Sequence, residues 1–322
     1  MKPVKAFIVH TDYTLLSAVM TKRTHYPGEC ADLYVVMQKR NSKELLDAVR
    51  DEFVNVYELE PYENKQSYIW IFQRTKWFKH YKEQLSPEKY EEIFCGLWDK
   101  AVYIAKHISV RWTKINFIEE GGVFYDSRNH LTKRALHSPL HHTLISVFHF
   151  DGLFWPMRNR VDKIFLYAPE LYDAKLKATL KKIEFSDLHL KLLVCSYRDN
   201  DCIHLGTLPQ GQERIEKTYY KPHPLESPQL PVELYYSKLT KSELESKVII
   251  GSASSALLTP KTIFGCEPFI ISTHKFDRPS NEKKYKETLF AKLCSFYEDQ
   301  SKLYAPNSYD ELDSLLEELS NV

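Results

Sequence analysis

The chain has 322 residues, of which 43% are hydrophobic and 27% are charged, and its formal net charge is +1. This length exceeds that of a typical single domain, so two domains of about 150 residues are expected. The near-neutral charge argues against a nucleic-acid-binding protein, and the lack of a hydrophobic run of about 18 residues argues against a transmembrane segment.

The six cysteines are scattered along the chain without a CxxC pair. This usage is typical of free thiols in a reducing compartment rather than of a disulfide framework. No set of Cys and His residues has the paired spacing of a zinc site. The first residues lack the apolar segment of a signal peptide, so we expect a cytoplasmic protein.

Strand-like and helical patterns alternate through the first half of the chain. The expected strands are residues 4–10, 33–37, 101–105 and 115–118, and the expected helices are residues 14–20, 42–53 and 87–98. The short apolar runs at 54–57 and 68–72 are ambiguous. Alternation of this kind predicts a parallel sheet with helices on both faces.

A second series of elements follows a less regular stretch around residues 138–159. Its expected strands are residues 163–167, 190–195, 217–221, 232–234, 247–250 and 268–272, and its expected helices are residues 281–298 and 309–319. The sequence therefore predicts an α/β protein with two Rossmann-like domains, residues 1–155 and 156–322. Ligands are expected in a cleft between them, beyond the carboxyl ends of the strands.

An acidic turn stands at the end of the strand expected at 115–118. Glu119 and Glu120 are followed by Gly121 and Gly122, although the chain has only nine glycines. Consecutive side chains at the end of a strand point to opposite faces of the sheet, so at most one of the two carboxylates would face a ligand. That carboxylate could act as a general base. The alternative is a pair of exposed carboxylates beside a turn.

A histidine lies between two prolines after the strand expected at 217–221. Pro222 and Pro224 restrict the backbone around His223, and such a fixed imidazole could donate to a phosphate or protonate a leaving group. A structural turn with a solvated imidazole is the alternative.

A glycine-serine segment follows the strand expected at 247–250. Gly251, Ser252, Ser254 and Ser255 combine free amide groups at a helix start with hydroxyl groups, which is a combination that binds phosphate. Plain capping of the helix by serine is the alternative. The segment lacks the Gly-Lys-Ser/Thr of a P-loop.

Two further groups are weaker candidates. Asp199 and Asp201 could hold a divalent cation beside a diphosphate, but a polar turn is the preferred interpretation. His137, His141 and His142 have no carboxylates at metal-binding spacing and are interpreted as part of a loop.

Taken together, three motifs resemble those of a known enzyme group. Glu119-Glu120-Gly121, His223-Pro224 and Ser254-Ser255 are similar, in type and order, to the acidic-acidic-Gly, His-Pro and Ser-Ser motifs of bacterial sialyltransferases. This is the lipooligosaccharide sialyltransferase and polysialyltransferase group, glycosyltransferase family 52 and its relatives. Residues 7–16 also resemble the opening strand and loop of that group.

The resemblance implies a GT-B fold and inverting, metal-independent transfer of sialic acid from CMP-sialic acid. It implies that Glu119 is the general base, that His223 contacts or protonates the departing CMP phosphate, and that Ser254 and Ser255 hold this phosphate. The family's acidic motif often begins with Asp, so Glu119 departs from the usual pattern.

The implied acceptor is a galactose-type hydroxyl of a bacterial surface glycan, such as a lipooligosaccharide, an O-antigen or a capsule. Thr11, Asp12, Glu120, Gly121 and Gly122 are candidates for acceptor binding or support. No cofactor, metal or nucleic acid is expected. The alternatives are a CMP-Kdo-type glycosyltransferase, a non-catalytic polysaccharide-assembly protein and, with less support, a nucleotide-sugar epimerase.

A lipid-linked acceptor would bring the protein to the inner face of the cytoplasmic membrane. Residues 74–82 interleave lysine with aromatic residues, a mixture found at lipid interfaces. An ordinary amphipathic helix, with its aromatic side chains in the core, is the competing interpretation of this segment.

Overall fold

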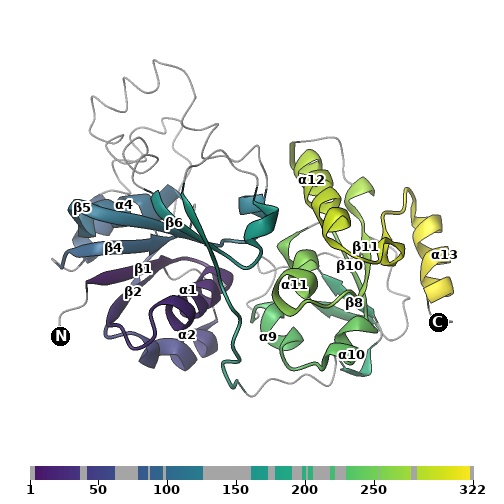
Figure 1. The fold of residues 1–322 in the computed structure, drawn as a ribbon, viewed down its shortest axis with the longest axis horizontal. Coiled ribbons are helices and arrows are strands. Elements are labelled where there is room, and N and C mark those ends of the chain that lie inside the picture. Colours follow the sequence, from purple (N-terminus) through teal and green to yellow (C-terminus); the bar gives the residue numbers. More distant parts are fainter. Residues whose placement is uncertain are drawn as a thin grey trace, which may run out of the picture. The chain divides into compact units, whose positions relative to one another are not determined.

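The computed structural model divides the chain into two compact α/β units, Met1–Glu184 and Phe185–Val322 (Figure 1). The structure describes residues 4–36, 42–61, 79–85, 88–96, 99–125, 161–172, 178–190, 198–200, 202–205, 218–221, 230–252, 254–276 and 281–319.

The first unit is built on a seven-stranded sheet with the order β3-β2-β1-β4-β5-β6-β7. The strands are β1 (Lys5–Val9), β2 (Ala31–Val36), β3 (Val56–Leu59), β4 (Tyr90–Cys95), β5 (Ser109–Ile118), β6 (Val161–Leu166) and β7 (Thr179–Lys182). All neighbouring strands in this sheet are parallel. This is the Rossmann strand order, and its direction reverses between β1 and β4.

Helices cover both faces of this sheet, with α1 and α2 on one face and α4 on the other (Figure 1). Their bounds are α1 (Asp12–His25), α2 (Lys43–Val49) and α4 (Asp99–Ile108), and short 3₁₀ turns lie at Arg50–Glu52, Gly122–Tyr125 and Pro169–Leu171. The central strands β1 and β2 are buried almost throughout, as expected of parallel strands covered on both faces.

Two elements of the first unit differ from the sequence-based expectation. The helix expected at 87–98 is strand β4, and the strand expected at 101–105 is helix α4. β4 pairs with both β1 and β5, so sheet pairing decides its conformation. The segment of α4 buries Ala101, Ile104, Ala105 and Ile108, which is a helical spacing.

The second unit contains a five-stranded parallel sheet with the order β12-β11-β10-β8-β9. The strands are β8 (Cys202–Leu205), β9 (Thr218–Lys221), β10 (Val248–Gly251), β11 (Phe269–Ser272) and β12 (Leu303–Tyr304). The helices are α9 (Val232–Tyr236), α10 (Lys241–Glu245), α11 (Ser255–Phe264), α12 (Asn281–Phe296) and α13 (Tyr309–Leu319), with 3₁₀ turns at His274–Phe276 and Gln300–Lys302. The strand order reverses between β8 and β10.

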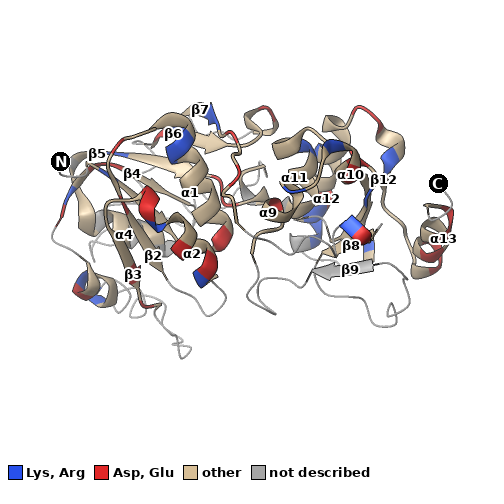
Figure 2. Cartoon of the chain, turned by 90° about the horizontal axis from the view of Figure 1, so that it is seen from below, with Lys and Arg blue, Asp and Glu red and all other residues tan. Residues whose placement is uncertain are grey.

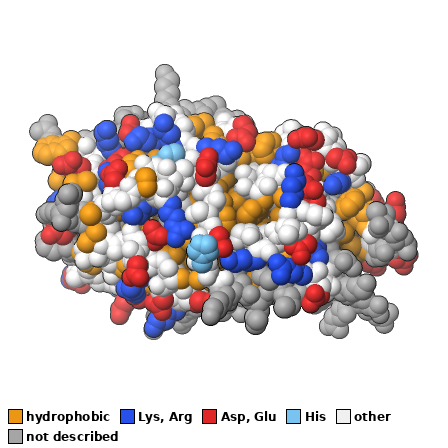
Figure 3. Space-filling model, turned by 60° about the horizontal axis from the view of Figure 1, so that its bottom comes forward, with side chains coloured by type: hydrophobic (Ala, Val, Ile, Leu, Met, Phe, Trp, Pro, Cys, Tyr) orange, Lys and Arg blue, Asp and Glu red, His pale blue; other side chains and the backbone are white. Residues whose placement is uncertain are grey.

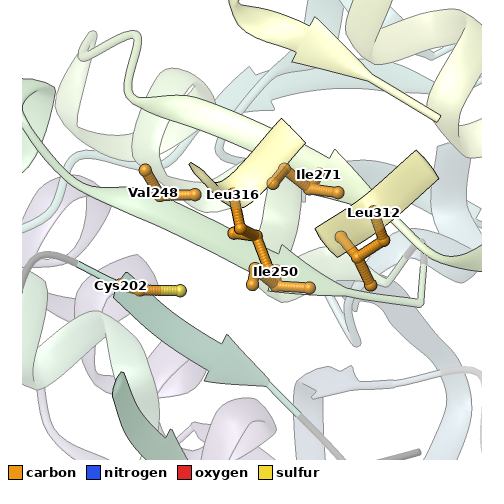
Figure 4. Packing of buried hydrophobic residues seen from close by; sticks show 6 residues of the cluster. All are labelled: Cys202, Val248, Ile250, Ile271, Leu312 and Leu316. Carbon is orange, nitrogen blue, oxygen red and sulfur yellow. The ribbon is translucent and has the colours of Figure 1, made fainter. Parts of the chain in front are cut away.

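The last helix packs its apolar side on the second sheet (Figure 4). Leu312 and Leu316, one helical turn apart, lie in a cluster with Ile250 and Ile271. Acidic residues are frequent on the rest of α13 (Figure 2), which is the expected pattern for a surface helix.

Most of the remaining expected elements are confirmed to within a few residues, and the ambiguous run at 54–57 belongs to β3. The expected strand at 232–234 is wrong: the segment is helix α9, which begins directly after Pro231. Residues 68–72 and most of 190–195 lie outside the described residues.

The boundary between the units differs from the expected one. The second domain was expected to begin at residue 156, but β6 and β7 continue the first sheet beside β5, and the first unit ends at Glu184. The α/β class with two Rossmann-like units is confirmed.

Acidic and basic side chains are interspersed on the face drawn in Figure 3. Among the helices that the structure describes, none is long and apolar enough to cross a membrane.

Candidate functional site

The carboxyl ends of four neighbouring strands carry the polar residues of the first unit's candidate site. His10 follows β1, Gly96 follows β4, Glu119 and Glu120 follow β5, and Tyr167 follows β6. In open parallel sheets, ligands bind beyond the carboxyl ends of the strands, near the point where the strand order reverses. The acidic turn therefore lies in the part of the sheet where a ligand site is expected.

Glu119 is buried and held by at least three hydrogen bonds. Its side chain is 2% exposed. The Tyr13 hydroxyl donates to Oε1 at 2.7 Å, and the Tyr125 hydroxyl donates to Oε2 at 2.5 Å. The backbone amide of Tyr167 also donates to Oε2, at 2.8 Å. Both oxygens of this carboxylate are therefore engaged inside the fold.

Tyr125 links this carboxylate to the backbone after β6. Its hydroxyl oxygen accepts a hydrogen bond from the amide of Ala168 at 3.2 Å while it donates to Glu119. Burial, followed by the negative charge of Glu119, raises the pKa of the Tyr125 phenol well above its ordinary value. Tyr125 therefore remains a hydrogen-bond donor at neutral pH.

Glu120 has a different environment. Its Oε1 lies 2.9 Å from Nε2 of the buried His10, and its side chain is 17% exposed. Its Oε2 has no hydrogen-bond partner among the described residues. A Cβ on Gly96 would lie 2.5 Å from this oxygen, so any side chain at this position would force the carboxylate to shift. Burial and the nearby Glu120 charge raise the pKa of the Cys95 thiol to about 12.

The glycines and the opening loop shape the turn. Gly121 has φ of +86°, a left-handed conformation that favours glycine, and Gly122 begins a 3₁₀ turn. Thr11 caps α1 by accepting from the amide of Thr14, and both carboxylate oxygens of Asp12 share the hydrogen bond donated by the single amide N–H of Ser42. Thr11 and Asp12 therefore hold the start of α1 in place.

The glycine-serine segment of the second unit lies where strand β10 ends, beside the reversal of strand order between β8 and β10. A Cβ on Gly251 would lie 3.1 Å from the carbonyl oxygen of Leu205, so the two strand ends approach closely. Ser252 follows Gly251, Ser254 is the N-cap of α11, and Ser255 is its first residue. The Ser254 side chain makes no capping hydrogen bond.

A second polar pair follows the neighbouring strand β11. The Ser272 hydroxyl lies 2.7 Å from Nδ1 of His274, and both side chains are buried. The amide of Thr273 donates to the carbonyl of Gly251 at 3.0 Å. The ends of β10 and β11 are therefore tied together beside the start of α11.

Several sequence-based candidates lie outside the described residues: His137, His141, His142, Asp201 and His223. Asp199 is described, in a short segment whose Asn200 carbonyl accepts from Lys247 at 2.7 Å. Among the described residues, no group of three His, Cys, Asp or Glu side chains is placed to hold a metal ion.

The segment proposed for membrane contact is described only in part. Residues 74–78 lie outside the described chain, Tyr81 is fully buried, and Lys79 is exposed. The buried Tyr81 matches an ordinary amphipathic helix and is not available to a lipid surface.

Sequence reasoning missed His10, Tyr13, Gly96, Tyr125 and Tyr167 as site residues. Gly96 directly follows a strand, as Glu119 does, and the same rule about strand ends would have found it had β4 been assigned correctly. His10 already stood at the end of the strand expected at 4–10, but nothing in the sequence indicated its contact with Glu120. Tyr13, Tyr125 and Tyr167 carry no local signal, because their role depends on contact with Glu119.

The comparisons with known proteins find likeness in structure but not in sequence. No family model matches the chain, and no curated protein matches its sequence. Among solved structures, the chain is similar to the crystal structure of MurG from Acinetobacter baumannii, with a TM-score of 0.46 and 9% sequence identity. The match covers 99% of this chain and 90% of that chain. A likeness at this level assigns neither an activity nor a substrate.

Proposed function

We propose that the protein is a GT-B glycosyltransferase, and specifically an inverting, metal-independent sialyltransferase that uses CMP-sialic acid. One observation carries the proposal: an acidic and a hydroxyl-rich motif each follow the carboxyl end of a strand, close to the strand-order reversal of its own parallel sheet. The motifs in the first unit suit an acceptor hydroxyl, and those in the second suit a phosphate. The order of the motifs, which resembles that of bacterial sialyltransferases, selects the sialic acid donor.

In the proposed reaction, a carboxylate of the Glu119–Glu120 turn takes the proton of the acceptor hydroxyl. The hydroxyl oxygen attacks the anomeric carbon of the sialic acid, and the bond from this carbon to the CMP phosphate oxygen breaks. The configuration inverts in this single displacement. The products are the sialylated glycan, CMP and the protonated carboxylate, which returns its proton to solvent.

The leaving CMP phosphate is proposed to bind at the start of α11. Amide groups at a helix N-terminus and the macrodipole stabilise an anion, and the Ser254 hydroxyl is not used for capping. Gly251, Ser252 and Ser255 would contribute amide groups or hydroxyls, and His223 would donate to the same phosphate. Such stabilisation of developing charge is usually a large part of catalysis.

The proposed acceptor is a galactose-type hydroxyl of a bacterial surface glycan, which could be lipid-linked. The proposed location is cytoplasmic, with peripheral contact at the inner face of the membrane. A vesicle flotation assay tests that contact. Failure to bind anionic vesicles at low salt would rule out the proposed membrane contact.

The first experiment is a transfer assay with CMP-sialic acid and a β-galactoside acceptor in the presence of EDTA. We expect CMP release and a sialylated product. CMP release without product would support CMP-sialic acid as the donor and show that the acceptor is not the β-galactoside. Release of CMP only from CMP-Kdo would favour the Kdo-type alternative, and no release from either donor would favour a non-catalytic assembly protein.

A further inference from the structure

We infer that the base of the proposed reaction is Glu120, the second carboxylate of the turn, and that His10 is the residue that positions it. This assignment rests on the proposed function for its reaction. The pairing of the two side chains rests on the geometry alone. Glu119, the first carboxylate, then has a structural role.

Glu119 has little capacity left to act as a base. Each of its oxygens already accepts from a tyrosine hydroxyl, and Oε2 also accepts from a backbone amide. Hydrogen bonds to the charged form of a carboxylate favour that form and lower its tendency to take a proton. A substrate hydroxyl would also have to displace one of these donors from a side chain that is 2% exposed.

Glu120 has the capacity that Glu119 lacks. His10 occupies only Oε1, at 2.9 Å, and Oε2 has no partner among the described residues. Oε2 is itself buried, so the Glu120 side chain, which is 17% exposed overall, must turn before a hydroxyl can reach this oxygen. A buried carboxylate oxygen without a donor is unfavourable, so turning it toward an incoming hydroxyl supplies the donor that it lacks. The absence of a side chain on Gly96 leaves the space that this oxygen occupies.

His10 is held so that it can orient Glu120. It follows β1 directly, and its backbone amide donates to Oγ1 of Thr14 at 3.2 Å, next to the N-cap of α1. With a proton on Nε2, the imidazole donates to Oε1 and anchors that oxygen while Oε2 turns toward the acceptor. Oε2 then takes the proton of the acceptor hydroxyl, and the imidazole keeps its own proton throughout.

Four variants test the roles by activity. We expect Glu120→Gln to lower kcat by about 10² to 10⁴-fold, with the KM for the donor unchanged. His10→Ala should lower kcat without changing the donor KM, and His10→Gln, which keeps an N–H donor, should recover part of the loss. Gly96→Ala should displace the carboxylate and lower kcat in the same way, although every polar group of the pair is retained.

Glu119→Gln is the matched control, and Tyr13→Phe is a milder control if that variant fails to fold. Both should lower stability and leave most of kcat in the folded protein. If Glu120→Gln remains active while folded Glu119→Gln is inactive, the assignment is overturned.

A measurement without substrate separates this inference from the proposed function. The imidazole ¹⁵N signals of His10, assigned by their loss in His10→Gln, should shift in Glu120→Gln and remain in place in Tyr13→Phe. Unchanged signals in Glu120→Gln would overturn the pair whatever reaction the protein catalyses. If the signals shift but the protein transfers no sugar, the His10–Glu120 contact is supported and the proposed sialyl transfer is rejected.

Discussion

At the scale of single residues, Glu119 shows how the fold accommodates a buried carboxylate. Burial of an unpaired carboxylate is strongly unfavourable, whereas hydrogen bonds to the charged form offset that cost. Tyr13, Tyr125 and the amide of Tyr167 supply those bonds from three separate segments of the chain. The carboxylate therefore joins the start of α1, the turn after β5 and the end of β6.

This geometry predicts that Tyr125→Phe destabilises the first unit by about 1–3 kcal/mol. The change removes a donor to Glu119 and an acceptor for the amide of Ala168, both inside the fold. Urea denaturation followed by hydrogen exchange would separate the response of the first unit from that of the second. Tyr309→Phe, at a side chain that is 45% exposed, is the control and should change stability little. Equal effects of the two changes would contradict the proposed role of the Glu119 contacts.

The sequence identified the acidic turn but not the different roles of its two carboxylates. Glu119 and Glu120 are identical side chains in adjacent positions, so no local pattern distinguishes them. Their difference comes from Tyr13, which lies 106 positions from Glu119, and from His10 at the end of another strand. Such contacts exist only after the sheet has formed.

At the scale of elements, two helix starts in the second unit use their N-cap residues differently. Thr240 forms a full capping box with Glu243 at the start of α10. Ser254 occupies the same position at the start of α11 but makes no side-chain capping bond. A capping hydroxyl stabilises its helix, whereas an unused hydroxyl is available to a ligand.

We therefore predict that Ser254→Ala changes the free energy of unfolding little but weakens CMP binding. Thr240→Ala is the matched control and should cost about 1 kcal/mol without changing CMP binding. Urea denaturation and titration calorimetry with CMP measure the two effects. If Ser254→Ala lowered stability as much as Thr240→Ala and left CMP binding unchanged, the phosphate role of Ser254 would be wrong.

Elements with a clear pattern were predictable, and the errors have a common cause. Residues 90–95 and 101–105 are short segments, only partly apolar in the first case, whose local pattern fits either conformation. Placement of 90–95 between β1 and β5 made it a strand, and the next segment became the helix that crosses to β5. The expected order of the two conformations was therefore reversed in this region.

At the scale of the whole molecule, the number of units was predictable from chain length, but their boundary was not. The second domain was expected to begin at residue 156, within the less regular stretch around 138–159, yet β6 and β7 after it belong to the first sheet. The apolar run of β6 has no feature that tells which sheet it joins. Pairing with β5 decides this.

Buried tyrosines in both units predict a loss of stability at alkaline pH. Burial raises the pKa of Tyr26 to about 12, and burial raises the pKa of Tyr125 and Tyr236 well above the ordinary value. Below pH of about 10, these phenols are protonated in the folded and unfolded states alike, so their contribution is fully present. As pH rises toward 12, the unfolded chain releases protons that the folded chain retains.

Each such tyrosine should therefore lower the free energy of unfolding by about 1.4 kcal/mol per pH unit above its unfolded pKa. Urea midpoints measured at increasing alkaline pH test this expectation. Tyr26→Phe should reduce the slope of unfolding free energy against pH by the contribution of one tyrosine. A stability that stays flat well above the ordinary tyrosine pKa would contradict the prediction.

The contacts of Glu119 join residues far apart in the sequence, and this affects the order in which the first unit folds during synthesis. During synthesis, α1 leaves the ribosome long before β5 and β6. Glu119 cannot accept the hydrogen bond from the amide of Tyr167, which lies 48 positions later, until β6 has also emerged. The site in the first unit is consequently one of its last parts to form. Until then a nascent chain holds β1, β2 and α1 beside an incomplete sheet, and this is the stage at which it most needs protection from aggregation.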